Sequence, residues 1–291
     1  MKSYDAVIDT GAGDSFTDIY GIKRLAIMVY TRLVAKSAGV PVVLAPQTIG
    51  PFKSFLGRTA AKRTLRDASA VMARDSISAN FSASLGRAVD CLATDVVFSL
   101  PASAAPRTYT SDVLLNVSGL LWATDSHGSS TAYRDLVRAL IEGCLSRGRA
   151  VTLLAHVLDN PSLDNDIGAI DPLMSEFGDQ IDAFIPSDLN EARDFIAGAN
   201  IVIGARMHAC LNALSLGIPA IPLAYSRKFA PLLADIGWPY TMDLNTEKDI
   251  VGKVMALLDA RELNAEALNV RSRAEALLEA AAERLTDRVR I

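Results

Sequence analysis

The chain has 291 residues, of which 50% are hydrophobic, 21% charged and 6% aromatic, with a formal net charge of −4 and a pI near 5.5. These values are typical of a globular α/β protein and exclude an intrinsically disordered chain. The negative charge, and the lack of a Lys/Arg run with interleaved aromatic residues, argue against nucleic-acid binding over a wide surface. Any anion site must therefore be local.

The cysteines and the N-terminal segment indicate the cellular compartment. Cys91, Cys144 and Cys210 lie far apart and form no Cys-x-x-Cys pair, so we expect buried free thiols and no metal site. The N-terminus does not resemble a signal peptide, and the most apolar helical run, from Leu25, is interrupted by Arg32 and too short to span a bilayer. We expect a cytoplasmic protein.

Predicted strands and helices alternate along the first third of the chain. The order is a strand at 6–8, a glycine-rich loop at 11–15, a helix at 22–38, a strand at 41–45, a loop at 47–51, a helix at 57–67, a strand at 70–73, a helix capped by Asp75 or Ser76 and ending at Leu85, and a strand at 89–92. This alternation predicts one Rossmann-like layer.

A second alternating series follows a linker predicted at 101–110. It comprises strands at 113–117, 151–154, 201–203 and 220–223, helices at 133–147, 188–197 and 209–216, and an amphipathic helix over 263–289, for which a coiled coil is the alternative. We therefore predict two α/β domains, 1–105 and 106–291.

The segment from Asn200 to Lys228 places cations at one sheet edge. Arg206 and His208 directly follow a buried strand, and Lys228 follows the next strand. Crossover geometry puts both loops at the carboxyl edge of a parallel sheet, beside a helix N-terminus, which favours an anion site. The alternative is a salt-bridged arginine and a surface histidine.

Several motifs, in order, resemble the polysaccharide pyruvyl transferases: GAGDSFTD, PVVLAPQTIGPF, ARDSIS, ATDVVFSL, LLAHV and GARMHACLNALSLGIPAIPLAYSRK. The resemblance covers nearly the whole chain. It implies two Rossmann-like domains facing across a cleft, as in the glycosyltransferase-B architecture, with the acceptor on the first domain and the donor on the second. It also implies transfer of a pyruvyl group from phosphoenolpyruvate to hydroxyls of a cell-surface polysaccharide or its precursor, forming a ketal without a cofactor.

The same resemblance assigns roles to individual residues. His208 matches the catalytic histidine, suited to protonating the enol methylene. Arg74, Arg206 and Lys228 match the family's basic ligand-binding positions, which suit a carboxylate and a phosphate. Arg74 has the alternative of pairing with Asp75 or Asp95.

Further contacts are expected from the loops. Gln47 and Gly50 are predicted to line the cleft. His156, which precedes the acidic cluster at 164–166, has a role in binding the acceptor or a metal, or belongs to a capped polar loop. The acceptor is expected to be a sugar or a lipid-linked oligosaccharide, which leaves peripheral membrane association open.

Two other functions remain open. A nucleotide-sugar glycosyltransferase would share the architecture, but it would need acidic groups for ribose hydroxyls, and the run from Gly204 to Lys228 contains none. A truncated, non-catalytic homologue is the second alternative. Because the glycine-rich loop begins only ten residues after Met1, the first domain looks short, and we expect either weak activity or an exposed apolar edge strand that a partner or a second copy covers as a homo-oligomer.

Overall fold

The computed structural model describes residues 4–101, 110–158, 164–226 and 229–289, and its chain divides into two compact units. Unit 1 takes in residues 1–98 and 273–291, and unit 2 takes in residues 99–272. Most of the linker predicted at 101–110 lies outside the described residues. The two predicted alternating series thus fall into different units.

Unit 1 contains a parallel sheet with the strand order β1-β2-β3-β4 within the described residues. Its elements are β1 (Val7–Asp9), α1 (Ile22–Ser37), β2 (Val42–Gln47), α2 (Phe55–Asp67), β3 (Ala70–Ala73), α3 (Ser76–Ser84) and β4 (Cys91–Leu92), followed by the short helix η1 (Val96–Ser99). Within the described residues β1 lies at one edge of this sheet, and its Ile8 is 53% exposed.

The strands of unit 1 alternate their side chains between two apolar layers. Leu44 and Val71 pack with the helix side chains, whereas Val43 and Met72 point to the other face. Ala281 of α11 (Glu262–Val289) covers that second face. The last part of α11 therefore belongs to unit 1, whereas the sequence pattern placed the whole helix with the second domain, because amphipathic spacing does not specify which sheet a helix covers.

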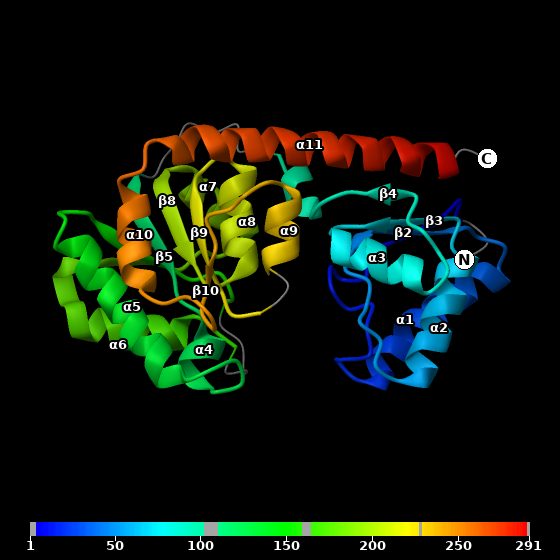
Figure 1. Ribbon diagram of the computed structural model, residues 1–291, viewed down its shortest axis with the longest axis horizontal. Coiled ribbons are helices and arrows are strands. Elements are labelled where there is room, and N and C mark those ends of the chain that lie inside the picture. The colour runs from blue at the N-terminus through cyan, green and yellow to red at the C-terminus, as the bar shows by residue number, and fades with distance from the viewer. Residues whose placement is uncertain (1–3, 102–109, 159–163, 227–228, 290–291) are drawn as a thin grey trace. The chain divides into compact units, whose positions relative to one another are not determined.

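Unit 2 contains a parallel sheet whose order is β10-β9-β8-β5-β6-β7 within the described residues, with helices on both faces (Figure 1). Its elements are β5 (Ser111–Asn116), α4 (Gly119–Ala123), α5 (Ser130–Leu145), β6 (Val151–Leu154), α6 (Ile167–Phe177), η2 (Gly178–Gln180), β7 (Asp182–Phe184), α7 (Leu189–Ala197), β8 (Ala199–Gly204), α8 (Met207–Ser215), β9 (Ala220–Ala224), α9 (Phe229–Asp235), β10 (Met242–Asp243) and α10 (Ile250–Leu258).

The strand order of unit 2 reverses at its centre. From β5 the chain moves outward to β6 and β7, then returns to pair β8 with β5 and continues to β9 and β10. The carboxyl ends of β5 and β8 therefore flank a topological switch point, the place where open parallel sheets bind ligands. This relationship locates the candidate site.

The predicted element types agree with the structure wherever the apolar pattern is strong. The strands over 70–73 and 151–154 have the predicted bounds, and Asp75 caps α3 by accepting a hydrogen bond from Ser78 N. The elements without a sequence prediction are short or interrupted: α6 contains Pro172, and β7 is partly exposed.

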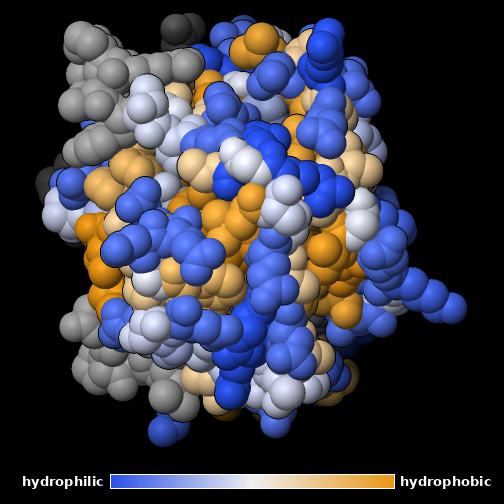
Figure 2. All heavy atoms as spheres, turned by 90° about the vertical axis from the view of Figure 1, so that its left-hand side faces the viewer, coloured by the Kyte–Doolittle hydropathy of each residue, from blue (hydrophilic) through white to orange (hydrophobic). Residues whose placement is uncertain are grey.

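The described helices include none that is long and apolar enough to cross a membrane. The face of unit 2 shown in Figure 2 is largely hydrophilic, with smaller apolar areas between the polar residues.

Cys144 and Cys210 are buried free thiols, as predicted, and burial raises the pKa of both, that of Cys144 to about 11. Cys91 is a free thiol that is only partly buried.

Candidate functional site

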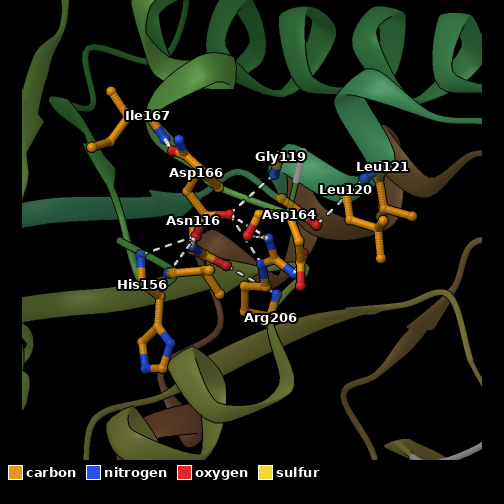
Figure 3. Close-up of polar contacts among 12 residues, drawn as sticks. Asn116, Gly119, Leu120, Leu121, His156, Asp164, Asp166, Ile167 and Arg206 are labelled. Atoms are coloured by element: carbon orange, nitrogen blue, oxygen red, sulfur yellow. Dashed lines mark hydrogen bonds and ion pairs between the residues drawn. The ribbon is translucent and has the colours of Figure 1, made fainter. Parts of the chain in front are cut away.

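A fully buried carboxylate, Asp166, lies at the switch point of unit 2. Asp166 Oδ2 accepts hydrogen bonds from the backbone nitrogens of His156 and Val157, at 3.0 and 2.9 Å, and Oδ1 accepts one from Gly119 N at 3.0 Å (Figure 3). A buried carboxylate is stable only with such partners. Asp166 thereby fixes the loops that follow β5 and β6.

Asn116, the last residue of β5, joins three neighbouring strands. Its Nδ2 donates to Leu154 O of β6 at 2.9 Å and to Asp166 Oδ2 at 3.2 Å, and its Oδ1 accepts from Arg206 N, just beyond β8, at 2.9 Å. Asn116 is fully buried. These bonds hold the carboxyl edge of the sheet in a fixed geometry.

Arg206 is buried at the start of α8 and is paired with two carboxylates. Its Nε and Nη2 donate to Asp166 Oδ1 at 3.0 and 2.7 Å, and its Nη1 donates to Asp164 Oδ1 at 2.5 Å. Burial disfavours its charged form, but the charge of Asp166 and the hydrogen bonds to Asp166 and Asp164 outweigh burial, so the pKa of Arg206 is raised. Arg206 therefore forms the salt bridge that was the alternative to an anion-binding role. Both of its acidic partners lie outside the segment from Gly204 to Lys228.

His208 lies in the first turn of α8 and is exposed. The helix N-terminus there carries partial positive charge, and the backbone nitrogens of Ala209 and Cys210 already donate to Arg206 O. Lys228, the third cation predicted for this edge, lies outside the described residues.

His156 lies two residues beyond β6 and contacts the same helix. Its ring Nε2 is 3.2 Å from Asn212 Nδ2 of α8. Burial first, and the nearby His208 second, lower the pKa of His156 to about 4. The structure thus brings together three of the predicted residues, His156, Arg206 and His208, in unit 2.

Arg74 follows β3 in unit 1 and is buried. Its Nη1 donates to Asp95 Oδ2 at 2.7 Å and its Nε donates to Thr48 Oγ1 at 2.8 Å. Of the two partners weighed from the sequence, Asp95 forms the ion pair, whereas Asp75 caps α3. Arg74 is thus engaged within unit 1.

Gln47 and Gly50, which were predicted to line the cleft, are both buried. In this structure they support the loops of unit 1 through contacts in its interior. Gln47 Nε2 donates to Asp9 O at 2.8 Å and to Ala45 O at 3.2 Å. Gly50 has a φ of 76°, and a Cβ there would lie 2.8 Å from the Phe81 ring.

Residues without a sequence prediction complete the site. The sequence pointed to Asp164 and Asp166 only as members of the acidic cluster at 164–166. Asn116 and Asn212 lie within strand and helix patterns that do not indicate a functional role. Among the described residues no group of three potential metal ligands occurs. A cavity of about 270 Å³ also lies in unit 2, lined by residues that include His127, Tyr133, Asn245 and Glu247.

Comparison with known proteins agrees with this architecture. A 2.2 Å crystal structure of a protein described as a UDP-N-acetylglucosamine 2-epimerase from Listeria monocytogenes superposes with a TM-score of 0.61 at 12% identity, covering 89% of this chain and 72% of that one. MnaA of S. aureus, solved with UDP, gives a TM-score of 0.62 at 13% identity over 98% of this chain and 77% of that one. These similarities confirm the α/β, glycosyltransferase-B-like fold class.

Sequence comparison identifies the family. The amylovoran biosynthesis protein AmsJ of Erwinia amylovora is 24% identical over 289 residues, covering 90% of this chain and 67% of AmsJ. The model of the polysaccharide pyruvyl transferase family matches residues 2–227. Both findings support a transferase that modifies polysaccharides, and the chain belongs to the polysaccharide pyruvyl transferase family.

Proposed function

We propose that the protein transfers a pyruvyl group from phosphoenolpyruvate to two hydroxyls of a polysaccharide or its precursor, forming a cyclic ketal. The observation that carries this proposal is the grouping of His208, His156 and Arg206 around the N-terminus of α8, at the switch point of the sheet. A helix N-terminus flanked by donors suits an anionic donor substrate.

The access of an anion to Arg206 depends on Asp164. Asp166 is fully buried, and both of its carboxylate oxygens accept several hydrogen bonds, whereas the side chain of Asp164 is 47% exposed. Asp164 Oδ1 accepts from Arg206 Nη1, and the backbone oxygen of Asp164 accepts from Nη2. A carboxylate or phosphate of the donor would replace Asp164 at Nη1 without disturbing Asp166. Arginine is well suited to this exchange because its planar donors bind two oxygens at once.

The chemistry needs one proton donor. The first sugar oxygen bonds to C2 of the enol as its hydroxyl proton leaves, and the methylene takes a proton from the acid and becomes a methyl group; the hydroxyl proton restores that acid. The second sugar oxygen then bonds to C2 as the bond from C2 to the phosphate oxygen breaks, and its hydroxyl proton leaves with inorganic phosphate. His208, exposed beside the site, supplies the first proton, a contribution of about 10² to 10⁴ in rate.

A nucleotide-sugar glycosyltransferase is the second candidate. It is favoured by one observation: the structure places Asp164, partly exposed, beside Arg206, and so supplies an acid that the Gly204–Lys228 run lacks. An acidic side chain at this edge suits ribose hydroxyls. The fold neighbour from S. aureus was solved with UDP.

A paired assay separates the two candidates. Release of inorganic phosphate from phosphoenolpyruvate with a panel of glycans, with a product mass increased by one pyruvyl group, is expected. Turnover of a UDP-sugar without phosphoenolpyruvate would replace the proposal by the second candidate.

His208→Gln should lower kcat at least 100-fold while calorimetric binding of phosphoenolpyruvate persists, and His127→Gln is the matched control. Normal kcat in His208→Gln would remove His208 from the mechanism.

A further inference from the structure

We propose that Arg193 and Asn212 are positioning residues that hold His156 as a neutral imidazole protonated on Nδ1, leaving proton transfer to His208. The residues come from α7 and α8 and from the loop after β6. Figure 3 shows the ring of His156 pointing away from Asp166, which binds its backbone nitrogen. The role of His208 rests on the proposed function, but the state of His156 does not.

Arg193 determines the orientation of the Asn212 amide. Arg193 is 5% exposed, and its Nη1 donates to Asn212 Oδ1 at 2.7 Å and to Ser215 Oγ at 2.9 Å. Its Nη2 donates to the carbonyls of Leu100 and Pro101. Because a guanidinium only donates, the oxygen of the Asn212 amide must face it, and the NH₂ group must face the opposite way.

The Asn212 amide in turn determines the tautomer of His156. Asn212 Nδ2 donates to His208 O at 2.8 Å and lies 3.2 Å from His156 Nε2. An amide NH₂ only donates, so His156 Nε2 must accept and carries no proton. A neutral imidazole with an unprotonated Nε2 has its proton on Nδ1, which makes His156 a donor of fixed direction.

The surrounding charges also favour the neutral ring. Burial is the main cause that lowers the pKa of His156, with His208 and Arg206 of the α8 region acting in the same direction. The charge of Asp166, which precedes α6, raises the pKa of His156, but this carboxylate is already paired with Arg206. Two adjacent histidines in different environments divide their roles, as acid and base pairs do in active sites. His156 is then a donor that does not titrate near neutrality.

Nitrogen NMR of the histidine rings tests this assignment in the substrate-free protein. The chain has only three histidines, so His127→Gln, His156→Gln and His208→Gln assign the signals. We expect His156 to remain neutral with a protonated Nδ1 from pH 8 to about pH 5. A proton on Nε2, or titration like an unperturbed histidine, would overturn the proposal without any further variant.

Two variants test the positioning residues. Asn212→Asp should move the ring proton to Nε2 and shift the titration of His156 toward neutral pH, whereas Arg193→Lys, which keeps a cationic donor, should preserve the parent tautomer. In the pyruvyl transfer assay, Asn212→Asp should change the pH profile of kcat more than KM. Unchanged ring signals in a folded Asn212→Asp protein would exclude the role of Asn212. Absence of transferase activity would refute the proposed function and leave the tautomer measurement valid.

Discussion

Asp166 and Arg206 are 40 residues apart in the sequence, yet the Asp166 carboxylate accepts from Nε and Nη2 of Arg206 at 3.0 and 2.7 Å in the interior of unit 2. One residue immediately precedes α6 and the other immediately precedes α8. The pair therefore fixes the starts of two helices on one sheet edge, and it makes Arg206 a structural residue as well as a candidate ligand-binding residue.

Removing the charge of Asp166 should destabilise the protein strongly. Asp166→Asn leaves the guanidinium of Arg206 without its buried partner, so we expect a loss of about 3–5 kcal/mol in the free energy of unfolding. The half-exposed Asp164 pairs with the same guanidinium, and Asp164→Asn should cost less than about 1 kcal/mol. Urea unfolding of both variants measures the difference, and equal costs would contradict the assignment.

Asp164→Asn should strengthen the binding of phosphoenolpyruvate. The substitution removes the carboxylate that competes for Arg206 Nη1, and we expect roughly 3- to 10-fold tighter binding, which corresponds to about 0.7–1.4 kcal/mol, the net value of a typical hydrogen bond. Asp179→Asn, an exposed acid at the far end of α6, is the control for net charge. If calorimetry gives both variants the parent affinity, the donor does not contact Arg206.

His156 should make stability depend on pH. Its pKa is about 4 in the folded protein and near 6.5 in a free histidine, so the unfolded chain binds the proton more readily. The contribution of His156 is therefore fully present above about pH 6.5 and is lost as the pH falls toward 4. Between pH 7.5 and 4.5 the parent should lose about 2 kcal/mol more than His156→Gln in urea unfolding. Parallel losses would show that His156 is not the cause.

The pair of Arg74 and Asp95 should show strong coupling in a double-mutant cycle. Both side chains are buried, so Asp95→Leu alone should cost about 3–5 kcal/mol. Arg74→Met with Asp95→Leu should cost clearly less than the sum of the single changes, because neither charge is then left alone. The more exposed pair of Arg138 and Asp135 should couple by less than about 1 kcal/mol. Additive effects at Arg74 and Asp95 would contradict this pairing.

Gly11 should tolerate a side chain less well than Gly39. Both have positive φ, 59° and 75°, so Ala at either position is strained by about 1 kcal/mol. At Gly11 the added Cβ would also lie 2.0 Å from Gln47 Oε1, whereas nothing lies within 4 Å at Gly39. Thermal unfolding of Gly11→Ala and Gly39→Ala should therefore show the larger loss at Gly11.

The sequence by itself determined the local structure and the position of the candidate site. The apolar runs at 70–73 and 151–154 predicted strands with the observed bounds, and the order of strand and helix placed Arg206 and His208 at a carboxyl edge. These inferences succeed because side-chain periodicity and helix capping depend on residues a few positions apart.

The tertiary structure decided which charges meet. In the sequence Arg206 was a candidate cation for a ligand, because its partners Asp164 and Asp166 lie on another loop. Arg74 had two candidate acidic partners, and in the structure it pairs with Asp95. The tautomer inferred for His156 follows from Arg193 and Asn212, on two different helices. Ion pairs and buried hydrogen bonds form between segments that the chain topology brings together, so local sequence patterns cannot specify them.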